Sequence, residues 1–131
     1  MEVNIMPFVK LTTVQKLTCE QKTALSKSFS EVMKHVPGKE DTGAILYFED
    51  GETFMIDGCE MEDFVFVETD ICGKFPYQVK YDFTVASFNA IKKVLGTDDA
   101  NMSMKIQEHL GWGGFGDYIE TDEAGKPLAK R

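Results

Sequence analysis

The sequence predicts one α/β domain made of two β-α-β units, whose strands form a four-stranded mixed sheet with two helices on one face. Three observations support this prediction. Short segments alternate apolar and polar residues, as strands do, and two longer segments carry apolar residues at helical spacing. The pattern of the first half also returns in the second half, since an offset of 58 residues lays Leu25 on Phe83 and Gly38 on Gly96.

The first half of the chain predicts a strand over Phe8–Val14, a helix, and a second strand over Ala44–Phe48. Thr18 is followed three residues later by Gln21, which matches a capping box at the start of the helix. The pair Pro37-Gly38 ends the helix, because proline and glycine favour a stop there. The apolar residues on one face of this helix are Leu25, Phe29, Val32, Met33 and Val36.

The second half repeats this order after a turn and a short strand near Thr53–Ile56. A strand is predicted over Phe64–Ile71, and the last main strand covers Met102–Gln107. Between these strands, the segment Gly73–Pro76 introduces a second helix, which Gly96 ends. The apolar stripe of that helix contains Val79, Phe83, Ala86, Ala90, Ile91, Val94 and Leu95.

The order of elements leaves two folds open. A right-handed crossover in each unit gives two parallel strands with the helix on one face. The ferredoxin-like fold has the same β-α-β-β-α-β order, so periodicity does not separate it from two directly paired units. The run Ile45–Phe48 is apolar at every position, which indicates that both sheet faces are covered. We therefore expect the face without helices to pack against other subunits.

The length of 131 residues fits one domain, expected over residues 1–116 with an extension at 1–6 and a polar, mobile tail at 117–131. A net charge of −8 argues against nucleic acid as a partner, because phosphate binding needs a basic surface. The three cysteines form no Cys-x-x-Cys pair and are expected to be reduced thiols. No apolar run of about 18 residues and no signal peptide occur, so we expect no membrane span and a cytoplasmic location.

Five short motifs occur in a recognisable order. They are Met6–Val9, Gly38-Lys39, Phe54–Gly58, Ile71–Lys74 and Leu110–Gly113. Their order and spacing, over residues 6 to about 116, resemble those of the macrophage migration inhibitory factor and tautomerase family. The resemblance implies the tautomerase fold, a homotrimer that closes three sheets around a central channel, and no cofactor.

The resemblance also implies an active site that interconverts keto and enol forms of a small α-keto acid such as phenylpyruvate. Pro7 matches the catalytic proline, whose secondary amine is the base when it is N-terminal. Lys39 matches the lysine that holds a substrate oxygen, Cys72 matches a pocket position, and Trp112 is expected to line the pocket. Without the resemblance, the same residues are a strand-starting proline, a solvated loop lysine, a small buried thiol and a core aromatic.

Several features count against a standard member of that family. Pro7 follows Met6 in the chain, and a proline nitrogen inside a peptide bond has no available lone pair. The stretch Lys105–His109 lacks the tyrosine and asparagine of the cytokine members, and arginines that bind dicarboxylates are also missing. The two histidines, His35 and His109, lie far apart in sequence, so no metal site is expected.

Three functions therefore stay open. The chain is an active tautomerase if Pro7 becomes N-terminal. It is an inactive, trimeric binding or structural module if the extension persists, since Val3 and Ile5 continue the strand pattern backwards and could carry the chain across the pocket mouth. A ferredoxin-like small-molecule sensor is the third reading.

Overall fold

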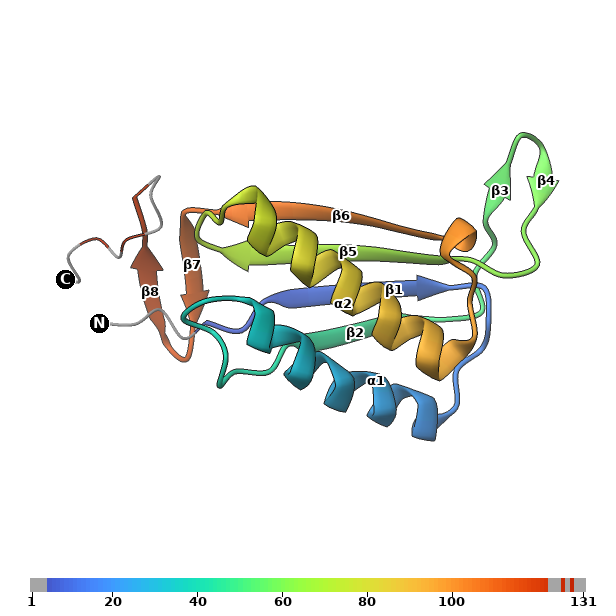
Figure 1. Ribbon diagram of the computed structural model, residues 1–131, viewed down its shortest axis with the longest axis horizontal. Helices are drawn as coiled ribbons and strands as arrows, with labels where there is room; N and C mark the ends of the chain where they lie inside the picture. Colours follow the sequence, from blue (N-terminus) through green and yellow to red (C-terminus); the bar gives the residue numbers. More distant parts are fainter. Residues whose placement is uncertain (1–4, 123–125, 127, 129–131) are drawn as a thin grey trace.

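The computed structural model describes residues 5–122, 126 and 128, and its centre is a four-stranded sheet with two helices packed on one face (Figure 1). The sheet strands are β1 (Phe8–Thr13), β2 (Ile45–Glu49), β5 (Val65–Cys72) and β6 (Met102–His109). The helices are α1 (Cys19–Val32) and α2 (Tyr77–Leu95), with short 3-10 helices η1 (Met33–His35) and η2 (Asp99–Asn101). Two hairpins are formed by β3 (Met55–Ile56) with β4 (Cys59–Glu60), and β7 (Gly111–Gly114) with β8 (Asp117–Glu120).

The strand order β2-β1-β5-β6 separates the two folds that the sequence left open. Strand β1 pairs in parallel with β2, β5 pairs in parallel with β6, and β1 and β5 pair antiparallel in the centre. In a ferredoxin-like split β-α-β unit, another strand lies between the two parallel strands. Here the parallel strands of each unit are direct neighbours, so the predicted mixed sheet of two β-α-β units is confirmed.

Helix α1 begins and ends through local sequence signals. The Oγ1 atom of Thr18 accepts a hydrogen bond from Gln21 N at 3.1 Å, and Gln21 Oε1 accepts one from Thr18 N at 2.9 Å, so the predicted capping box is confirmed. The helix was expected to include Val36, but α1 ends at Val32 and the tighter η1 follows. Val36 is still buried, because the 3-10 turn keeps it facing the sheet side.

The hydrophobic core fills the space between the helices and one face of the sheet. Alternate residues of β1 and β5 point toward the helices, because successive strand side chains project to opposite faces. The largest fully buried apolar side chains are Phe29, Leu11, Leu25, Met33, Ile91, Val9, Val36, Val65 and Val67.

The other face of the sheet is more polar than the sequence indicated. Lys10 Nζ lies 3.5 Å from Glu49 Oε1, and Lys105 Nζ lies 3.2 Å from Glu68 Oε1. Apolar groups occur mainly at β2, where Tyr47 stacks on the ring of Phe8. The expectation of two apolar faces is therefore wrong for most of the sheet, because β1, β5 and β6 alternate apolar residues with polar or charged ones.

The two hairpins were not predicted in full. The β3–β4 hairpin extends beyond one end of the sheet, whereas β7 crosses the opposite end and pairs with β8 (Figure 1). Residues 117–120 thus form a strand where a mobile tail was expected, and residues 123–125, 127 and 129–131 of that tail lie outside the described part. No helix in the described ranges is long and apolar enough to cross a membrane.

Candidate active site

The candidate active site lies at the end of the sheet where β1 begins, β5 ends and β7 crosses (Figure 1). Pro7 directly precedes β1, is buried, and its carbonyl oxygen accepts a hydrogen bond from Ile45 N at 2.8 Å. Phe8 pairs with Asp70 in the antiparallel register, so the start of β1 lies beside the last residues of β5. Cys72 is the final residue of β5, and the strand pairing therefore brings Pro7 and Cys72 to one end of the sheet.

Lys39 reaches this end of the sheet from the loop after η1. Its side chain is buried, with the residue only 3% exposed, and Nζ donates a hydrogen bond to the backbone oxygen of Ile5 at 2.8 Å. Burial lowers the pKa of the Lys39 ammonium, because desolvation disfavours the charged form, while the nearby Cys72 partly opposes this shift. Lys39 is thus not the solvated loop lysine that its sequence context alone suggested.

Cys72 lies close enough to Lys39 for the two groups to influence each other. The residue is 2% exposed, and burial raises the pKa of its thiol, while the Lys39 charge acts in the opposite direction. A raised pKa keeps the sulfur protonated and poorly nucleophilic. In the chain that retains residues 1–6, here called the uncut chain, the Cys72 thiol is therefore buried and poorly nucleophilic.

Trp112 lies on β7 and contacts a neighbouring part of the same end of the sheet. Its ring is edge-on to the ring of His109, with 5.6 Å between ring centroids. His109 ends β6, pairs with Cys72 in the strand register, and places Nε2 2.7 Å from Asp70 Oδ1. The structure thus brings together Pro7, Lys39 and Cys72, and places Trp112 on the adjoining His109–Asp70 pair.

Sequence reasoning missed the Asp70–His109 pair and the contact of Ile5 with Lys39, although it allowed the segment of Ile5 to cross the pocket mouth. Ile5 acts through its backbone oxygen, which any residue carries, so no sequence signal identifies it. Asp70 and His109 are 39 residues apart, and only the β5–β6 pairing brings them together. Among the described residues, no three His, Cys, Asp or Glu side chains gather in a group that could hold a metal ion.

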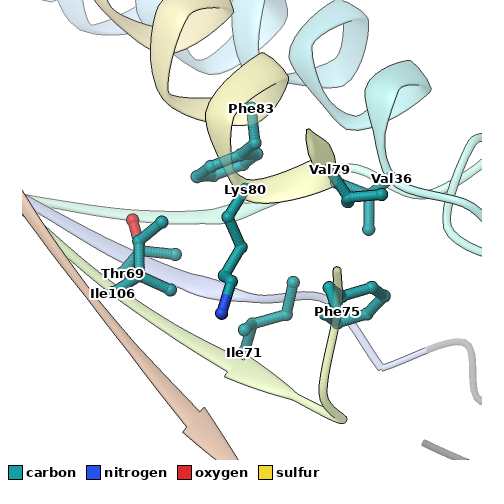
Figure 2. A pocket seen from close by; sticks show the side chains of 8 residues that line it. All are labelled: Val36, Thr69, Ile71, Phe75, Val79, Lys80, Phe83 and Ile106. Carbon is teal, nitrogen blue, oxygen red and sulfur yellow. The ribbon is translucent and has the colours of Figure 1, made fainter. Parts of the chain in front are cut away.

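A separate pocket lies between the sheet and the start of α2. Figure 2 shows that its side chains come from α2, from the strands and from the segments that hold Val36 and Phe75. The space at its centre is about 10 Å³, which is close to the minimum that holds one water molecule. This pocket is too small for a keto acid. Thr69 lies on its wall, and the buried hydroxyl of Thr69 has no hydrogen-bond partner within the described part of the chain.

Comparisons with known proteins support the fold. No family model matches the chain, and no curated protein matches it in sequence. Among solved structures, MIF2 from Leishmania major matches with a TM-score of 0.78 and 18% identity, covering 86% of this chain and 97% of that protein. The protein Pt0534, solved after inactivation by 2-oxo-3-pentynoate, matches with a TM-score of 0.70 and 13% identity over 83% of this chain and 92% of its own.

A fused 4-OT described as a symmetric trimer also matches, with a TM-score of 0.67, 14% identity, 77% of this chain covered and 85% of that chain covered. At these identities the similarity concerns the fold. The chain therefore has the fold of macrophage migration inhibitory factor and tautomerase-superfamily proteins, and the resemblance predicted from its sequence is confirmed at that level.

Proposed function

We propose that this chain is a tautomerase for a small α-keto acid, and that its proline-based activity is latent until Pro7 becomes the N-terminal residue. One observation carries the proposal. The backbone oxygen of Ile5 receives a hydrogen bond from Lys39 in a buried position next to Pro7, so the segment before Pro7 occupies the polar group that a substrate oxygen would use. Removing the residues before Pro7 would end the hydrogen bond between Lys39 and Ile5 and would also give Pro7 a basic nitrogen.

The proposed reaction uses two side chains of the site. The free Pro7 amine removes a proton from the carbon next to the keto group and returns it to the resulting enolate oxygen, as a general base and then acid. An apolar environment lowers the pKa of such an amine toward neutrality. Lys39 holds the carboxylate or keto oxygen through its ammonium group. The compound that inactivated Pt0534 is itself a 2-oxo acid by name, which supports this substrate class.

A second candidate function is a trimeric binding module without catalysis. The burial of Ile5, which is 9% exposed, and of Pro7 favours it, because both residues are already packed as permanent parts of the domain. The trimer is supported by the fused 4-OT trimer of the same fold and by the unpaired outer edges of β2 and β6 within the described chain. Under this proposal the extension stays in place, and the tautomerase site never opens.

Two proteins separate these functions: the uncut chain and a variant that starts at Met6, from which methionine removal leaves Pro7 as the first residue. Intact mass must verify both N-termini. We expect the trimmed chain to accelerate phenylpyruvate tautomerisation about 10²- to 10⁴-fold more than the uncut chain, the usual range of a positioned general base. Pro7→Ala in the trimmed chain should remove this gain, whereas Pro37→Ala, at an exposed proline, should keep it.

The binding-module function is favoured if the trimmed chain is folded and has the verified mass but gains no activity. The proline mechanism is also wrong if the gain survives Pro7→Ala. Circular dichroism on each variant distinguishes a lost site from a lost fold.

A further inference from the structure

The groups at this end of the sheet differ sharply in accessibility. Pro7, Lys39 and Cys72 are buried in the uncut chain. The side chains of His109 and Asp70, in contrast, are 39% and 30% exposed. The imidazole of His109 is therefore a proton-accepting group that solvent and small molecules reach while the proline site is closed.

The geometry of this pair suits proton transfer. His109 Nε2 lies 2.7 Å from Asp70 Oδ1, so Nε2 donates to the carboxylate when the ring is neutral and Nδ1 carries the lone pair. Within the described residues, Nδ1 makes no hydrogen bond. A carboxylate that accepts a hydrogen bond from one ring nitrogen fixes the tautomer and orients the other nitrogen, and this arrangement suits an imidazole for general-base catalysis.

A hydrophobic surface adjoins the histidine ring. The indole of Trp112 meets it edge-on at 5.6 Å between centroids, and Trp112 is half-buried on β7. The aromatic group of an aryl keto acid can pack against such an indole, because aromatic pairs favour offset or edge-on contacts. Other charged groups on this face of the sheet pair with one another: Lys105 with Glu68, and Lys10 with both Glu68 and Glu49.

We propose that Asp70 and His109 form a second, proline-independent base, which enolises an aryl α-keto acid bound against Trp112. The inference rests on the proposed function only for the substrate class. Nδ1 of His109 accepts a proton from the carbon next to the keto group, and the electrons of that C–H bond form the carbon–carbon double bond of the enolate. Water protonates the enolate oxygen, and His109 then returns its proton to water. His109 is the catalytic residue and Asp70 is a positioning residue.

The test uses the uncut chain, in which Pro7 cannot act as a base, and phenylpyruvate in D₂O. Proton NMR follows the exchange of the hydrogens next to the keto group, with buffer exchange subtracted. We expect His109→Gln to lower the protein-dependent rate at least about tenfold, a conservative share of a general-base effect. His35→Gln removes the other histidine of the chain and should leave the rate unchanged. Pro7→Ala in the uncut chain should also leave it unchanged.

Two further measurements separate chemistry from structure. Trp112 is the single tryptophan, so its fluorescence reports phenylpyruvate binding, which His109→Gln should leave within about twofold of the original affinity while the rate falls. Asp70→Asn should lower the exchange rate at least about tenfold while leaving phenylpyruvate binding within about twofold, because the ring loses the carboxylate that orients it. Asp70→Glu keeps a carboxylate and should recover part of the rate, whereas a merely structural role of Asp70 would weaken binding and catalysis together.

The proposal is overturned if the uncut chain catalyses no exchange above buffer, or if His109→Gln leaves the exchange rate unchanged. Neither result bears on the proline mechanism, which is tested separately by the Pro7-dependent gain in activity of the trimmed chain. Conversely, a trimmed chain without any gain leaves the His109-dependent exchange of the uncut chain fully measurable.

Discussion

The Lys39 ammonium donates a hydrogen bond to the Ile5 backbone oxygen at 2.8 Å, and this contact joins the segment before Pro7 to the loop that follows η1. Both partners are buried, so the bond forms away from water, where an unpaired ammonium would be costly. The segment before Pro7 and the lysine therefore stabilise one another. Removing the segment therefore changes the environment of Lys39 and, through the Lys39 charge, that of Cys72.

Thiol labelling should distinguish Cys72 from the other two cysteines. Cys19 and Cys59 are exposed, whereas Cys72 is buried and the pKa of its thiol is raised by burial. In the uncut chain, we expect two thiols to react promptly with a disulfide reagent and Cys72 to react at least about tenfold more slowly. In the trimmed chain, Cys72 should react faster, because Lys39 no longer donates to the Ile5 oxygen and its charge then favours the Cys72 thiolate. Cys72→Ala should abolish the slow phase alone.

The stability of the protein at alkaline pH should depend on Lys39. Burial lowers the pKa of Lys39 in the folded state below its ordinary value of 10.5, so folding carries the full desolvation penalty at lower pH. Between the folded pKa and 10.5, the unfolded chain keeps the proton and the folded chain has released it. The free energy of unfolding should therefore gain a rising contribution from Lys39 in this window.

Cys72 contributes with the opposite sign, because its pKa is raised above 9.0 in the folded state. As the pH rises from 9.0 to that folded-state pKa, the unfolded chain has lost the thiol proton and the folded chain keeps it, so the free energy of unfolding falls. Urea unfolding between pH 8 and 10.5 should therefore be measured in a Cys72→Ala background. Lys39→Met in this background should flatten the rise relative to Lys39. An identical pH dependence in both proteins would mean that burial does not perturb Lys39.

The proposed trimer should be visible by sedimentation equilibrium at micromolar concentration, with a mass about three times 14.7 kDa. Ile45 lies on the edge strand β2 and is 47% exposed in the single chain, so Ile45→Asp should shift the mass toward the monomer. Tyr77 is 75% exposed on α2, on the helical side of the sheet, and Tyr77→Asp is the matched control that should keep the trimer. A stable monomer of the unmodified chain would contradict the assembly.

The capping box of α1 gives a stability prediction that is independent of the site. Thr18→Ala removes the acceptor of the Gln21 backbone N–H and should lower the free energy of unfolding by about 1 kcal/mol. Thr18→Ser keeps the hydroxyl and should cost much less. Urea titration measures both, and equal losses for alanine and serine would show that the cap does not stabilise the helix.

The sequence alone determined the parts of this protein that depend on neighbouring residues. The capping box at Thr18, the apolar stripes of both helices and the alternation in β5 each arise within one segment, so local periodicity was sufficient to predict them. The repeated order of elements and the short motifs indicated the fold, and the resemblance selected Pro7 and Lys39 as site residues.

Only the tertiary structure decided what those site residues contact. A backbone oxygen has no sequence signature, so the hydrogen bond between Ile5 and Lys39, 34 residues apart, could not be predicted from residue types. The pair of Asp70 and His109 depends on the register of β5 against β6, and a shift of one residue would turn one side chain to the opposite face. Strand register and burial are properties of the packed sheet, and they determine which groups of this protein are closed and which are open to a ligand.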